Sequence, residues 1–213
     1  MKHFLSITSV TLLAMAPAAF AQKWEVGVAG GGSFSTSQTI KSAIGDANGG
    51  FSPGLAVSAW LGNNSNGTIS GELRYDYEHT DLKLSSGGTK VNFGAMTNAI
   101  HYDVVLHFAP SESHIRPFVA AGAGVKAFTG TGQEQEFQPL SNIALLTKTS
   151  QIEPLVSVGG GVKIALSPGL QLRLEAHDFL SPFPKNVIAP SPGSTVGGWL
   201  QDFVVMAGLS FTF

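Results

Sequence analysis

Apolar and charged side chains alternate along residues 67–79, which read G-T-I-S-G-E-L-R-Y-D-Y-E-H. One parity carries Ile69, Gly71, Leu73, Tyr75 and Tyr77, and the other carries Ser70, Glu72, Arg74, Asp76 and Glu78. Successive side chains of a β-strand point to opposite faces, whereas a helix would mix the two sets around its surface. This stretch therefore predicts a strand with one apolar face and one ionic face.

The same test predicts strands elsewhere in the chain. Alternation is clear in residues 24–34, 100–108, 152–166, 170–177 and 199–213. It is weaker in 53–62 and 115–128, which are rich in Gly and Ala. The sequence therefore predicts an all-β protein with about eight strands.

The predicted connections alternate between short and long. Residues 63–67, 110–113 and 167–169 are short polar turns, whereas 35–51, 80–91, 129–150 and 180–198 are longer and lack sustained periodicity, which predicts loops. Short turns at one end and long loops at the other are typical of an even-stranded antiparallel barrel. We expect an eight-stranded, up-and-down barrel with both termini on the side of the short turns.

Composition excludes several classes of protein. Charged residues make up 12% and apolar residues 43% of the chain, which argues against disorder. A net charge of −2 gives no basic field for nucleic acid. The absence of Cys excludes disulfides, thiol nucleophiles and Cys-based metal centres.

The first 21 residues have the form of a signal peptide. Met1-Lys2-His3 is a short basic start, the run from Phe4 to Phe20 is largely apolar, and Ala19-Phe20-Ala21 fits a cleavage site. The alternative is a membrane anchor, but Ser, Thr and Pro residues interrupt the run. We expect cleavage after Ala21 and a barrel domain over residues 22–213. An exported chain without a spanning helix is either soluble or a membrane barrel.

The apolar face of the strands is predicted to point outward. A lipocalin-like soluble barrel would instead hide that face. However, an eight-stranded barrel has little interior space, and the apolar face carries bulky aromatic residues, several of them near strand ends. They include Trp24, Tyr75, Tyr77, Tyr102, Trp199, Phe203 and Phe211. This distribution favours a barrel in a membrane.

Three segments resemble those of small outer-membrane barrels of Gram-negative bacteria. Leu209-Ser210-Phe211-Thr212-Phe213 resembles their C-terminal strand, which ends in Phe and is read by the barrel-assembly machinery. Residues 116–125 and 172–179 resemble the fifth and penultimate strands of OmpA-like or opacity-type barrels. The resemblance implies location in the cell outer membrane, outer-membrane lipids and the assembly machinery as partners, and Leu209, Phe211 and Phe213 as the assembly signal. No segment corresponds to a periplasmic peptidoglycan-binding domain, so tethering to the cell wall is not expected.

With the apolar face outside, the polar parity lines the lumen. The inward set comprises Glu25, Glu72, Arg74, Asp76, Glu78, His101, Asp103, Glu153, Lys163, Arg173, Glu175, His177 and Asp202. Unpaired buried charge is costly, so we expect Arg74 and Arg173 to bridge carboxylates and to fill the lumen without a continuous pore. The predicted ion network is Glu72, Arg74, His101, Asp103, Lys163, Arg173 and Glu175. The alternative is a scattered, solvated polar lining.

The sequence predicts no catalytic, cofactor or metal site. The glycine runs 30–32 and 159–161 lie inside predicted strands with no following helix, which is unlike a dinucleotide site. His101 and His107 are about 20 Å apart along one strand and cannot share a metal alone. His79, Asp81, His177 and Asp178 lie near the predicted long-loop end, where lipid-modifying barrel enzymes keep their sites.

We therefore expect a monomeric outer-membrane barrel with a structural or surface-interaction role through its long extracellular loops. The sequence names no partner for the loops. Two alternatives remain open at this point, namely a barrel enzyme acting on outer-membrane lipid and a weak channel for small solutes.

Overall fold

The computed structural model describes residues 23–64, 67–133 and 137–213. The expected signal peptide, residues 1–21, lies outside the described residues. No helix in the described part of the chain is long and apolar enough to cross a membrane.

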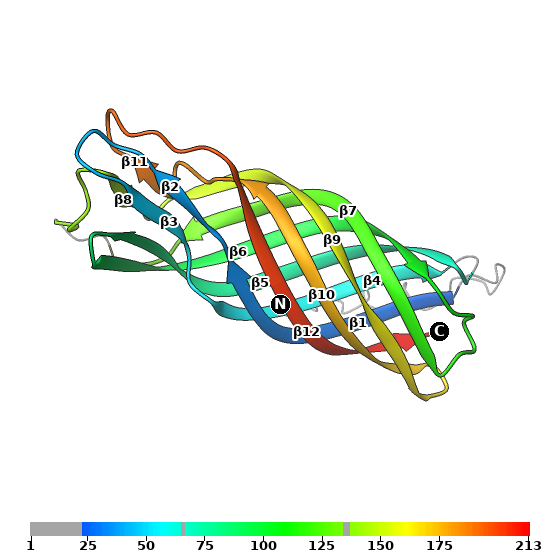
Figure 1. The fold of residues 1–213 in the computed structure, drawn as a ribbon. Helices are drawn as coiled ribbons and strands as arrows, with labels where there is room; N and C mark the ends of the chain where they lie inside the picture. The colour runs from blue at the N-terminus through cyan, green and yellow to red at the C-terminus, as the bar shows by residue number, and fades with distance from the viewer. Residues whose placement is uncertain (1–22, 65–66, 134–136) are drawn as a thin grey trace, which may run out of the picture.

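Eight strands of the described chain form one closed antiparallel ring (Figure 1). They are β1 (Lys23–Ser35), β4 (Gly54–Asn64), β5 (Ile69–Ser86), β6 (Thr89–His107), β7 (Ile115–Gly130), β9 (Ser150–Ser167), β10 (Leu170–Pro182) and β12 (Trp199–Thr212). Each strand pairs with the next ring strand along the chain, and β1 pairs with both β4 and β12, which closes the ring. The predicted eight-stranded up-and-down barrel is confirmed.

Side chains in the ring follow the predicted parity. On β5, Leu73 and Tyr75 are exposed on the outside, whereas Glu72 and Arg74 are buried inside. The exposed outer residues of the other ring strands are likewise mostly apolar, as in Val28, Val104 and Val205. The barrel is therefore apolar outside and polar inside over its middle section.

The long connections are more ordered than the sequence predicted. Four short strands lie there, namely β2 (Ser37–Ile40), β3 (Ala47–Phe51), β8 (Ala144–Leu146) and β11 (Ile188–Pro190). β2 pairs with β3, β3 also pairs with β5, and β8 pairs with β11. Strands of three to five residues are too short to show a period, and the β8–β11 partners lie far apart in the sequence. The prediction of loops was wrong for these segments.

Residues 80–91 are also not a long loop. β5 and β6 continue to Ser86 and Thr89, and Gly87 and Gly88 alone connect them, with φ angles of 54° and 87°. Two consecutive residues with positive φ are typical of a tight hairpin turn, which suits glycine. The prediction of a long connection over residues 80–91 was therefore wrong.

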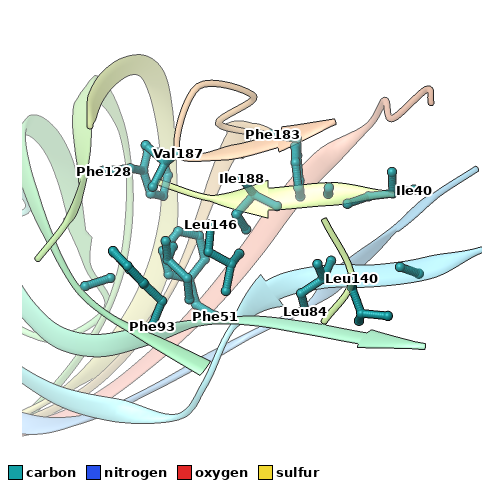
Figure 2. Close-up of a cluster of buried hydrophobic side chains, with 14 of the residues drawn as sticks. Ile40, Phe51, Leu84, Phe93, Phe128, Leu140, Leu146, Phe183, Val187 and Ile188 are labelled. Carbon is teal, nitrogen blue, oxygen red and sulfur yellow. The ribbon is translucent and has the colours of Figure 1, made fainter. Parts of the chain in front are cut away.

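An apolar core fills the end of the barrel that carries β2, β3, β8 and β11, which we call the cap (Figure 2). Its sixteen buried residues are Ile40, Ala47, Phe51, Leu82, Leu84, Phe93, Ala95, Phe128, Leu140, Ile143, Ala144, Leu146, Phe183, Val187, Ile188 and Leu200. They come from the long connections and from the adjoining strand ends. The end of the barrel that carries the cap is the cap end. The opposite end, which carries the short turns, is the turn end.

Candidate functional site: the ionic network of the lumen

The lumen below the cap contains buried charged side chains from most of the ring strands. The seven residues of the predicted network all point inward. Arg74 is 1% exposed and Arg173 is 0% exposed. Glu153, which the sequence also placed inside, is only partly buried.

Two arginines hold the centre of this network. Arg74 donates hydrogen bonds from both terminal nitrogens to the two carboxylate oxygens of Glu175, at 3.1 and 2.7 Å. Arg173 donates to Glu72 at 2.7 Å and also to Glu175. Because β5 and β10 lie on opposite sides of the ring order, the Arg74–Glu175 and Arg173–Glu72 bonds cross the lumen, whereas the Arg173–Glu175 bond lies within β10. Bidentate, charge-assisted bonds of this kind are among the strongest hydrogen bonds in proteins.

Two aromatic residues pack against the arginines. The guanidinium carbon of Arg173 lies 4.7 Å from the ring centre of Trp60 and 4.4 Å from that of Phe118. Arg74 lies 5.1 Å from the same Trp60 ring. Flat guanidinium groups stack well on aromatic faces, so the rings complete the packing around the charges. The sequence did not predict that Trp60 and Phe118 point inward, because alternation is weak in 53–62 and 115–128. Their positions two residues beyond the buried Ser58 and Arg116 place them on the same inner face.

A lysine closes each end of the network. Toward the turn end, Lys163 donates to Glu25 at 2.6 Å. Toward the cap, Lys126 donates to Glu78 at 2.8 Å and also to Asp202. The prediction placed both carboxylates inside but missed Lys126, because the small residues of 115–128 obscured the alternation.

His101 lies between two carboxylates. Its Nε2 is 2.8 Å from Asp76 and its Nδ1 is 2.9 Å from Asp103. An imidazole donates to two carboxylates at once only when both ring nitrogens carry protons. The geometry therefore favours a charged imidazolium at His101, which offsets part of the negative charge in the lumen.

Glycines on the inner face provide the space for these side chains. A Cβ at Gly122 or Gly124 would overlap Asp103 or His101, and one at Gly27 would overlap the ring of Trp60. A Cβ at Gly159 would come within 2.5 Å of His177. The glycine runs in the strands thus leave room for a filled lumen.

The residues considered for lipid chemistry are not brought together. His79, Asp81 and Asp178 lie on the outward parity of their strands, whereas His177 is buried inside. His177 therefore faces the lumen, where its polar parity placed it. Its Nδ1 is 3.3 Å from the Ser157 hydroxyl, but both side chains are buried within the lumen. Within the described residues, no group of three or more His, Asp or Glu could hold a metal ion.

The residues of the predicted assembly signal lie on the outer face at the turn end. Leu209, Phe211 and Phe213 are exposed there, and the rings of Phe211 and Phe213 stack with centres 6.3 Å apart. The backbone of Phe213 exchanges two hydrogen bonds with Trp24, both of 2.9 Å. The end of β12 is thus held against the start of β1.

Known proteins provide an independent comparison. Residues 6–211 match the family model described as "Outer membrane protein beta-barrel domain". No curated protein matches the sequence.

Several solved structures share the fold at low identity. The Neisserial surface protein A has a TM-score of 0.54 and 13% identity, covering 90% of this chain and 97% of its own. The outer membrane protein OprG from Pseudomonas aeruginosa has a TM-score of 0.56 and 11% identity, covering 89% and 95%. A major outer membrane protein from Thermus thermophilus has a TM-score of 0.50 and 15% identity, covering 91% and 100%.

Proposed function

The chain belongs to the outer membrane protein beta-barrel domain family, and on that premise we propose that it is a closed barrel carrying an ordered extracellular surface for interaction with other molecules. In outer-membrane barrels the short turns face the periplasm and the longer loops face the exterior. The turn end is then periplasmic and the cap extracellular.

The observation that carries this proposal is the apolar core of the cap. Mobile loops have few buried apolar contacts, whereas the cap buries sixteen apolar residues. Such a core holds the outer surface of the cap in one shape. A fixed surface loses little conformational entropy when a partner binds.

The outer surface of the cap also exposes large apolar side chains. Phe137 is 73% exposed, Ile44 is 63% exposed, and Leu145 is also exposed. Removing a large apolar side chain from water is favourable, so a partner that covers it gains binding free energy. These residues are the positions where we expect contact with an extracellular partner.

The proposal assigns the barrel itself to membrane anchoring. The buried arginines, carboxylates and aromatic rings support a filled lumen rather than a channel. His79 and Asp81 lie on the outer face of the barrel, and His177 lies on the inner face. This separation gives no support to a lipid-modifying enzyme at the cap end.

Site-specific photo-crosslinking on intact cells tests the proposal. A photoreactive residue at Ile44 or Leu145 should give adducts with molecules outside the cell, and Phe203 on the membrane face is the matched control. The control should capture lipid only. If the cap positions give no adducts beyond those at Phe203, the surface-interaction role is wrong.

A further inference from the structure

The outer face of the barrel has a shallow apolar hollow over β1, β9, β10 and β12, which follow one another around the ring (Figure 1). The volume of the hollow is about 660 Å³. The outward residues that line it are Gly30, Gly160, Leu174, Ala176, Val205 and Ala207. Gly30 pairs with Ala207, and Gly160 pairs with Ala176. The surface is recessed there because these four residues end at or before Cβ.

A carboxyl group lies at the edge of the hollow toward the cap. Asp178 follows Ala176 on the outward side of β10, and Leu180 comes next on that side. The cross-strand partners of Asp178 are Phe203 on β12 and Val158 on β9. Both partners are exposed on the outer face. Apolar residues therefore surround Asp178 on all four sides of the membrane-facing surface.

The depth of Asp178 is just inside the apolar belt of the barrel. On β12, Gln201 is the first polar residue of the outer face in the direction of the cap, and it lies two positions from Phe203. Two residues of a strand span about 7 Å. Asp178, which pairs with Phe203, thus lies about one such step from the polar boundary. The chains of a lipid join its headgroup near such a boundary.

The carboxyl group of Asp178 lacks a hydrogen-bond donor at this depth. Its Oδ1 is buried and has no hydrogen-bond partner among the described residues, although the backbone of Asp202 interacts with the same carboxyl group. Whether ionised or protonated, a carboxyl group keeps an oxygen that accepts a hydrogen bond. Hydrocarbon supplies no donor, and a polar group left unsatisfied in it is costly. An ionisable residue in this position is expected to have a specific partner.

A second copy of this chain would supply no cation to Asp178 through this surface. In a twofold dimer the same surface patch of both copies meets, so the two Asp178 side chains would lie at the same depth. The described outward residues of β1, β9, β10 and β12 include no Lys or Arg. Two carboxyl groups would then be buried together without a compensating charge, which is unfavourable. A lipid with a neutral donor group fits the site better.

We propose that the hollow and Asp178 form a binding site for one acyl chain of an outer-leaflet lipid that carries amide or hydroxyl groups where its chains join the headgroup. The chain lies over the Gly and Ala residues of the hollow. An N–H or O–H of the lipid donates to Asp178. The choice of leaflet rests on the proposed function, which places the cap outside the cell, whereas the contacts of the site do not.

Native mass spectrometry of the folded barrel, released from detergent with added lipid, tests this proposal. The probes are monophosphoryl lipid A, which has amide-linked and hydroxylated chains, and phosphatidylglycerol, whose chains are ester-linked and carry no hydroxyl group. Asp178→Leu removes the acceptor, and Ala207→Leu fills the hollow. Ala123→Leu, at an exposed outward position on β7, is the matched control. Heat-dependent gel migration checks that each variant is folded.

Asp178→Leu should weaken the binding of lipid A at least tenfold and leave the binding of phosphatidylglycerol within twofold. Ala207→Leu should also weaken the binding of lipid A, whereas Ala123→Leu should leave it unchanged. The proposal is wrong if Asp178→Leu binds lipid A as tightly as the unmodified protein, or if it loses affinity for both lipids equally.

A dimer of the unmodified protein that Ala207→Leu dissociates would show that the hollow is a protein interface, which also overturns the proposal. None of these outcomes depends on what the cap binds. Failure of the lipid site therefore leaves the surface-interaction role standing, and failure of the crosslinking test at the cap leaves the lipid site standing.

Discussion

At the residue scale, the excess of carboxylates shapes the lumen. The network of the described residues holds seven carboxylates, namely Glu25, Glu72, Asp76, Glu78, Asp103, Glu175 and Asp202. Four Lys and Arg side chains and two histidines oppose them. Each cation therefore serves more than one carboxylate, and the loss of a cation leaves more uncompensated charge than the loss of one acid.

This imbalance gives a prediction for Arg173. Arg173→Met should destabilise the folded barrel by about 3–5 kcal/mol, because it removes one of the two arginines that Glu72 and Glu175 share. Glu72→Gln should cost less, since other carboxylates remain near Arg173. Urea unfolding in lipid vesicles measures both, with Glu153→Gln, at a partly buried position, as the control. The account would be contradicted if Arg173→Met lowered the free energy of unfolding by no more than Glu72→Gln does.

The sequence located most of this network because charged side chains mark the inward parity unmistakably. Glu72, Arg74 and Glu175 needed only the period of two. The sequence could not pair them, because pairing across the lumen depends on the ring order and the packing. It also left Trp60 unassigned, since an aromatic residue on the polar parity looks like an interruption of the pattern until its arginine neighbours are known.

At the element scale, β5 changes its pattern along its length. From residue 72 to residue 78 its inner side chains are charged. Beyond His79, Leu82 and Leu84 point inward, whereas Asp81 and Lys83 point outward. The apolar residues change parity because the outer surface then faces water and the interior is the cap core. The alternation with a period of two continues to the end of β5. A prediction that requires all apolar residues to share one parity, however, places the end of the strand at this change.

The cap core predicts a local effect of mutation. Leu84→Ala removes a side chain that is 1% exposed and should cost the cap about 2–5 kcal/mol, without opening the barrel below. Protease added to intact cells should then cut the cap, while heat-dependent gel migration of the barrel persists. Lys83→Ala, on the neighbouring outward position, should leave protease resistance unchanged. An equally resistant Leu84→Ala variant would argue against a cap held by this core.

The end of β12 carries a prediction about assembly. We propose that Phe213 is recognised by the barrel-assembly machinery, so Phe213→Ser should lower the yield in the outer membrane severalfold. Burial of one Phe contributes about 1.5–3 kcal/mol, which applies equally to Phe203 on the same strand face. Phe203→Ser is therefore the control in a membrane fractionation. Equal yields for the two variants would count against a recognition role for Phe213.

At the scale of the whole molecule, three layers fill the barrel from one end to the other. Polar side chains such as Arg116 and Gln171 lie at the turn end, the ionic network follows, and the apolar cap core closes the other end. Small eight-stranded barrels have just enough interior space for side chains. The fold class followed from the sequence, because alternation and connection lengths are whole-chain signals. The folded cap did not, because its short strands pair across long sequence separations.

The central claim is that this barrel is closed, and planar-bilayer recording of the intact protein tests it most directly. The packed arginines and aromatic rings should leave no path for ions, so the folded protein should show only rare, small openings. Replacing Arg74 and Arg173 together by Ser should increase conductance or unfold the barrel. A large, steady conductance of the unmodified protein would contradict the account.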